Sequence, residues 1–176
     1  MFNVAIDATD VLYQFGAMPA QAERATKRAL TLTAKWIDTQ GSRAIAKASG
    51  VPLKALKRGK GVGRVRIKSP SASALRASVW FGLMPVKAAY VGKLSQLKKG
   101  ARAGKHVFPG GFVGRMPSGH IGIYLRKGKA RLPIVEQSVK LEQAQTILEG
   151  VASEAGDVLQ QKMAHELNYE MNVRGK

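Results

Sequence analysis

The chain has 176 residues and no cysteine, 45% of its residues are hydrophobic, and 29 lysines and arginines against 11 acids give a formal net charge of +18. The length fits one domain over residues 1–176, and the hydrophobic content excludes a disordered basic tail. The absence of cysteine excludes disulfides and thiolate metal sites. A charge of this size predicts anionic partners, namely nucleic acid, an anionic membrane surface or acidic protein neighbours.

The N-terminal third of the chain predicts one long helix between shorter elements. Residues 2–6 alternate loosely as in a short strand, and residues 1–16 as a whole are expected to form an N-terminal arm. The long helix is expected over 18–48, with Pro19 in its first turn and Gly50 after its end. Its apolar residues recur at helical spacing: Ala22, Ala25, Ala29, Leu32, Trp36 and Ile37.

The middle of the chain changes to the alternating patterns of strands. A short helix is expected over 51–59 and strands over 62–69, 75–83 and 85–93. In the strand over 75–83, Ala77, Val79 and Phe81 share one face. That face is therefore the predicted buried side.

The next segment combines a basic stretch with hairpin signals. Residues 93–106 are rich in glycine and lysine and lack a period, so we expect a basic extended loop that orders on a partner. Residues 106–116 and 120–128 predict a hairpin around the turn Pro117-Ser118-Gly119, and 132–139 predicts a last short strand.

The C-terminal segment predicts a second long helix. An apolar stripe runs along it: Leu141, Ala144, Leu148, Val151, Ala155, Val158 or Leu159, Met163, Leu167 and Met171. The order of helix, strands and helix predicts an α+β fold. We expect one antiparallel sheet of about four to five strands, packed by the long N-terminal helix and the long C-terminal helix.

The charges are distributed unevenly along the chain. Residues 39–135 hold 21 lysines and arginines and no acid, and all 11 acids lie in the two flanking segments. An isolated globule would repel itself across such a middle. The end segments are expected to offset the charge, in the same chain or in a neighbouring copy.

The sequence contains no complete catalytic, metal-binding or cofactor-binding motif. The glycines of 59–64 and 100–106 lack the spacing of nucleotide-binding loops. His165 has no second histidine four residues away, which favours a surface helix position, and no acid lies between His106 and His120 to orient them. The sequence therefore predicts a non-enzyme with no cofactor. It also shows no signal peptide, and no run of about 18 apolar residues that would span a membrane.

The basic residues form two candidate contact sets for DNA or an acidic neighbour. The first set is Lys54, Lys57, Arg58, Lys60, Arg64, Arg66 and Lys68, and the second is Lys98, Lys99, Arg102 and Lys105. A solvated face is the plain alternative. No recognition helix is evident, so sequence-independent phosphate contact fits better than base reading. Phe108 and Phe112 are more readily explained by hairpin packing than by stacking on bases.

The chain resembles the minor tail protein Z family, the tail-completion proteins of tailed bacteriophages. The resemblance rests on the alanine-rich segment 18–48, the basic VPLKALKRGKGVGRVRIK and the glycine-rich PGGFVGR. It continues through HIGIYLRKGKARLPIVEQSV to a closing amphipathic helix that ends in QQKMAHELNYEMNV. It covers most of the chain and is loosest in residues 1–16 and 93–105.

The resemblance implies a structural role in the virion. It implies a ring-forming adaptor, expected to be hexameric, at the head-proximal end of the tail, assembled in the host cytoplasm. Its expected partners are further copies of itself, the tail terminator or tail tube protein, a head-side connector protein and the DNA passing through the ring. No membrane partner is expected. In the ring, the acidic C-terminal helix of one subunit is expected to lie against the basic sheet of the next.

Two other classes compete with this interpretation. A free sequence-nonspecific nucleic-acid-binding protein would bind duplex DNA as a monomer or dimer with a steep salt dependence. A nuclease would need clustered acids to hold divalent metals, and the sequence does not offer them.

Overall fold

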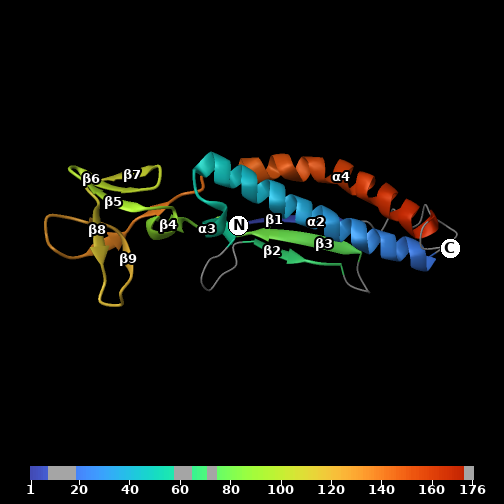
Figure 1. The fold of residues 1–176 in the computed structure, drawn as a ribbon, viewed down its shortest axis with the longest axis horizontal. Helices are drawn as coiled ribbons and strands as arrows, with labels where there is room; N and C mark the ends of the chain where they lie inside the picture. The colour runs from blue at the N-terminus through green and yellow to red at the C-terminus, as the bar shows by residue number, and fades with distance from the viewer. Residues whose placement is uncertain (8–18, 58–64, 71–74, 173–176) are drawn as a thin grey trace.

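The fold is an elongated α+β structure in a computed structural model that describes residues 1–7, 19–57, 65–70 and 75–172 (Figure 1). The helices are α2 (Pro19–Ser49), α3 (Leu53–Lys57) and α4 (Ala144–Asn172), with a short 3₁₀ turn at Ala88–Tyr90. The first strands are β1 (Phe2–Asp7), β2 (Val65–Lys68), β3 (Arg76–Phe81) and β4 (Val86–Lys87). The remaining strands are β5 (Leu94–Leu97), β6 (Gly100–Ala103), β7 (His106–Pro109), β8 (Phe112–Arg115), β9 (Ile121–Arg126), β10 (Ile134–Glu136) and β11 (Ser138–Val139).

The larger part of the molecule, the helix–sheet body, is two helices on one face of a small sheet. The strand order is β1-β3-β2, and both pairings are antiparallel. The helices α2 and α4 pack along each other, with α4 over β1 and α2 over β3 and β2. Figure 1 shows them running antiparallel, with the sheet beneath. The predicted inner face is confirmed, because Ala77, Val79 and Phe81 are all buried.

The close packing of α2 against its neighbours follows from its small residues. Ala25, Ala29 and Ala34 are fully buried. Thr26 and Thr33 are also buried, and each hydroxyl donates to the carbonyl four residues earlier, which satisfies it inside the core. Leu32, however, was predicted on this apolar stripe and is 38% exposed.

The second part, the β-module, covers residues 86–139 and extends from one end of the helices (Figure 1). It holds two three-stranded sheets, β5-β6-β7 and β10-β9-β8, and the short pair β11-β4. The predicted hairpin around Pro117-Ser118-Gly119 is confirmed, since β8 pairs with β9 across it. One buried core runs through both parts, from Leu148 and Phe81 to Ala101 and Ile123.

The prediction of one sheet of four to five strands is wrong. The described strands form separate sheets of two or three, because short strands joined by tight turns pair with their nearest neighbours instead of extending the first sheet. The strand expected over 85–93 is only two residues long and gives way to the 3₁₀ turn.

The extended loop expected over 93–106 is also absent. This segment forms the β5–β6 hairpin and the start of β7, and Ala101 and Ala103 are fully buried. Two-residue turns close both hairpins, and Gly104 adopts φ +57° in the second, a conformation that favours glycine. Residues 2–7 of the expected N-terminal arm form β1, and residues 8–16 lie outside the described part.

Candidate interaction surfaces

The first basic set is divided between a short helix and an edge strand. Lys54 and Lys57 lie on α3 and are exposed, and Lys57 pairs with Asp38 at 3.0 Å between Nζ and Oδ2. Arg66 and Lys68 lie on β2 and are also exposed. The other members of this set, Arg58, Lys60 and Arg64, lie outside the described residues.

Arg66 and Lys68 belong to what we call the open sheet face, the side of β1-β3-β2 that points away from the helices. Alternation and strand register place these residues on it: Asn3, Ala5, Arg66, Lys68, Arg76, Ser78 and Trp80. The Arg66 guanidinium lies 5.4 Å from the centroid of the half-buried Trp80 ring, within cation–π range. Sequence reasoning missed Trp80 and Arg76, although alternation with the buried Val79 predicts their face.

The second basic set lies on the β-module, away from the first (Figure 1). Lys98 and Lys99 form the β5–β6 turn, and Lys105 lies in the β6–β7 turn. Arg102 lies on β6 between the buried Ala101 and Ala103, so its side chain takes the opposite, exposed face. The two sets therefore do not form one continuous patch among the described residues.

The β-module carries further cations that the sequence analysis did not single out. All are exposed: Lys93, Arg115, Arg126, Lys127, Lys129 and Arg131. Arg126 lies 5.5 Å from the centroid of the Phe112 ring, which also contacts Tyr124, and Phe108 packs against the core. The prediction that these two phenylalanines serve hairpin packing is confirmed.

Glu136, on β10, is the single carboxylate within residues 86–139 and connects β4 with the β8–β9 turn. His120 Nε2 donates to its Oε1 over 2.7 Å, and Lys87 Nζ lies 2.8 Å from its Oε2. Burial acts to raise the pKa of Glu136, but the hydrogen bonds from Lys87 and His120 outweigh it and lower that pKa. The hydrogen bond to Glu136 in turn raises the pKa of Lys87. The expectation that His120 lacks an orienting acid is therefore wrong, because Glu136 reaches it from β10, sixteen residues further along the chain.

The acids of α4 divide into an inward and an outward group. Glu166 and Glu170 face α2 and are buried, and Glu170 Oε1 lies 2.7 Å from Arg28 Nη1. Arg24 Nε donates to the second oxygen of Glu170 over 3.3 Å. The outward group, Glu149, Glu154 and Asp157, is exposed and forms no ion pair within the described part of the chain, and the same holds for Glu142 in the turn before α4.

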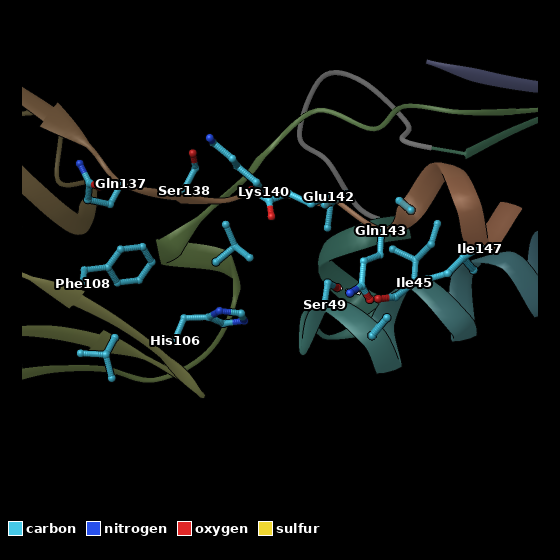
Figure 2. Close-up of a pocket in the computed structure, with 15 residues that line it drawn as sticks. Ile45, Ser49, His106, Phe108, Gln137, Ser138, Lys140, Glu142, Gln143 and Ile147 are labelled. Atoms are coloured by element: carbon cyan, nitrogen blue, oxygen red, sulfur yellow. Dashed lines mark hydrogen bonds between the residues drawn. The ribbon is translucent and has the colours of Figure 1, made fainter.

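A pocket of about 520 Å³ lies where the helix–sheet body meets the β-module. Figure 2 shows His106 and Phe108 on the β7 side and Ile45, Ser49 and Ile147 on the helix side. The buried Nε2 of His106 has no hydrogen-bond partner among the described residues.

Neither a metal site nor a membrane helix appears in the parts of the chain that the structure describes. No group of three His, Asp or Glu side chains there has the arrangement of a metal site. None of the described helices is long and apolar enough to cross a bilayer. The predicted surface position of His165 is confirmed, since its side chain is 76% exposed.

Comparison with known proteins assigns the chain to a family. Neither the curated proteins nor the solved structures contain a match to this sequence. The family described as prophage minor tail protein Z (GPZ) matches residues 9–174, which is nearly the whole chain. That match includes both long helices, the open sheet face from β2 onward and all of the β-module. The chain therefore belongs to the prophage minor tail protein Z family.

Proposed function

We propose that this protein is a non-catalytic tail-completion protein, which forms a ring at the head-proximal end of a phage tail, helps the tail join the head and lets DNA pass. Membership of a minor tail protein family supports a place in the virion. In this proposal the protein is made in the host cytoplasm and contacts the tail terminator or tail tube protein on one side and a head-side connector on the other.

The observation that carries the proposal is the concentration of exposed cations on the β-module. Around the single paired carboxylate of Glu136, this part presents lysines and arginines on two turns, a sheet face and the β9–β10 connection. The positive potential of such a surface extends about 8 Å into solution at physiological ionic strength. DNA in the lumen or an acidic neighbour would offset it.

The cations on the two β-module turns fit DNA contact without base reading. Lys98, Lys99 and Lys105 are side chains on short turns, and Arg102 lies on a sheet face. None belongs to a helix of the size that enters a major groove. Phosphate contact with counterion release needs only mobile positive charge, which this surface supplies.

Deleting the gene from an inducible prophage tests the proposed function. We expect the lysate to contain filled heads and unjoined tails by electron microscopy, and a plasmid copy to restore virions. Normal virions from the deletion strain would overturn the proposal.

A charge-removing variant tests which surface acts in joining. In the deletion strain, Lys98→Gln, Lys99→Gln, Arg102→Gln and Lys105→Gln together should lower the yield of joined particles about tenfold, since several phosphate or carboxylate contacts are lost at once. The melting temperature should stay close to that of the wild type, because all four side chains are exposed.

The matched control removes four exposed cations from elsewhere: Lys35→Gln, Arg43→Gln, Lys47→Gln and Lys140→Gln. Equal losses of joining in both variants would show that net charge matters and this surface does not. A collapse of melting temperature in the first variant, with normal joining per folded copy, would make its residues structural.

The free nucleic-acid-binding protein remains the second candidate, favoured by the same exposed cations. It differs in that the purified chain would bind duplex DNA as a monomer or dimer and would be absent from virions. Mass spectrometry of purified particles distinguishes the two.

A further inference from the structure

The open sheet face has the composition of a protein interface. Asn3, Ala5, Arg66 and Lys68 are exposed on it, and the half-buried Trp80 lies beneath the Arg66 guanidinium. Tryptophan and arginine are the residues most enriched among the energetically dominant contacts of protein interfaces. Neither Arg66 nor Lys68 forms an ion pair within the described part of the chain.

Two of the exposed cations on this face, Arg66 and Lys68, lie on the edge strand β2. Arg66 pairs in register with Trp80, and Lys68 pairs with Ser78. A binding partner would therefore meet two cations on the edge strand and a large aromatic ring beside them.

The outward face of α4 is complementary to this arrangement. Glu149, Glu154 and Asp157 are exposed there without a cationic partner among the described residues. Gly150 and Gly156 lie among them, and a Cβ added at either glycine would meet nothing within 4 Å. Packing inside this chain thus gives no reason for the two glycines, although each costs a helix about 1 kcal/mol relative to alanine. A surface that lets a bulky side chain approach the helix backbone would account for Gly150.

We propose that the outward face of α4 in one copy lies against the open sheet face of the next copy, so that Glu149, Glu154 and Asp157 pair with Arg66 and Lys68 while Trp80 packs against the helix backbone at Gly150. This interface rests on the proposed ring and names its surfaces. The extents are comparable, since Glu149 to Asp157 spans about 12 Å of helix and Val65 to Lys68 spans about 10 Å of strand.

The two faces cannot meet within one molecule. In Figure 1 the helix α4 and the strand β2 lie at opposite sides of the helix–sheet body, with α2 between them. Contact between different patches of successive copies is heterologous, and such contacts close into rings when the rotation permits. DNA is a poorer occupant of the open sheet face, because it would leave the carboxylates of α4 unpaired.

Reciprocal charge reversal tests the interface. The sheet variant carries Arg66→Glu and Lys68→Glu, and the helix variant carries Glu149→Lys and Glu154→Lys. The sheet variant alone would place like charges at every contact and the helix variant at all but those of Asp157, and we expect ring mass in solution and virion yield in the deletion strain to fall about tenfold or more. Coexpression should restore both, since the acidic sheet of one variant meets the basic helix of the other in an alternating ring.

The control is a reversal of equal size away from both faces, Lys127→Glu with Lys129→Glu, which should leave rings intact. Circular dichroism and melting temperature verify that each variant folds. Either reversal supporting assembly like the wild type, or coexpression failing to rescue two folded variants, would overturn the inference. If the sheet variant lost DNA binding but still formed rings, the inference would also be overturned, and the sheet face would be assigned to nucleic acid. Normal virions from the deletion strain would instead refute the proposed function itself.

Discussion

Glu136 shows how one residue supports the β-module. It is the only carboxylate between residues 39 and 141, and it binds His120 from the β8–β9 turn and Lys87 from β4. Gly122 leaves room for it, because a Cβ there would lie 3.1 Å from Glu136 Oε1. Replacing the carboxylate with a neutral group would leave Lys87 and His120 with a weaker hydrogen-bond acceptor, in a part of the chain that carries many other positive charges.

We expect Glu136→Gln to lower the free energy of unfolding at pH 7 by about 1–2 kcal/mol, toward the low end of the about 1.5–3 kcal/mol typical of hydrogen bonds to a charged group, because the site is partly exposed to solvent. The pKa of Glu136 is lowered in the folded state, so its stabilising effect is complete above the ordinary glutamate pKa and disappears as the pH falls through the folded pKa. Denaturant unfolding from pH 7 to pH 3 should therefore show the wild type and the variant converging at acid pH. Glu154→Gln, at an exposed site, should match the wild type throughout, and parallel curves for Glu136→Gln would contradict the assignment.

At the scale of elements, Leu148 joins the two long helices to the sheet. It is fully buried, and a Cβ added at Gly41 of α2 would lie 2.8 Å from its Cδ2 and 3.0 Å from Cζ of Phe81. The side chain thus fills the place where α2, α4 and β3 meet. Because the neighbours of Leu148 are closely packed, they have little freedom to move into the cavity that a smaller side chain would leave.

Leu148→Ala should therefore destabilise the protein by about 2–5 kcal/mol, the range for deleting a large buried aliphatic side chain. Urea unfolding followed by circular dichroism measures the change. Met171→Ala is the control on the same helix, since Met171 was predicted on the same apolar stripe but is 62% exposed. It should change the stability by less than about 0.5 kcal/mol. A small effect of Leu148→Ala would show that this junction is not tightly packed.

The elements predicted best are those with a long period. The helices over 19–49 and 144–172 follow from spacing alone, because a stripe of small or apolar residues over eight turns leaves little ambiguity. The β5–β6–β7 sheet was missed, although Gly104-Lys105 between short runs is a two-residue hairpin signal. Its buried positions are alanines, and lysines fill the turns, so composition suggested a solvated loop where the backbone in fact pairs.

For the whole molecule, the sequence predicted the positive surface but not its division. Charge counting identifies Lys98, Lys99, Arg102 and Lys105, yet only the fold separates them from Arg66 and Lys68 by placing the two groups in different parts of the structure. Pairings between distant positions, such as Glu136 with His120, depend on strand register that no local pattern reveals. Burial of Glu166 and Glu170 against α2 likewise removes two acids from the charge available to partners.

A chain with a net charge of +18 should be more stable when its charges are screened. Raising NaCl from about 0.02 M to about 0.5 M shortens the screening length several-fold, and we expect the melting temperature of dilute protein to rise by about 5 °C. Changing Lys127, Lys129 and Arg131 to glutamate lowers the charge from +18 to +12, since each exchange removes two charges, and should reduce this salt dependence. These side chains are exposed on the β9–β10 connection, so the exchange removes repulsion without removing packing. A melting temperature that is flat or falls with salt would mean that the ion pairs within the chain already balance the acid-free middle, and that it needs no anionic partner.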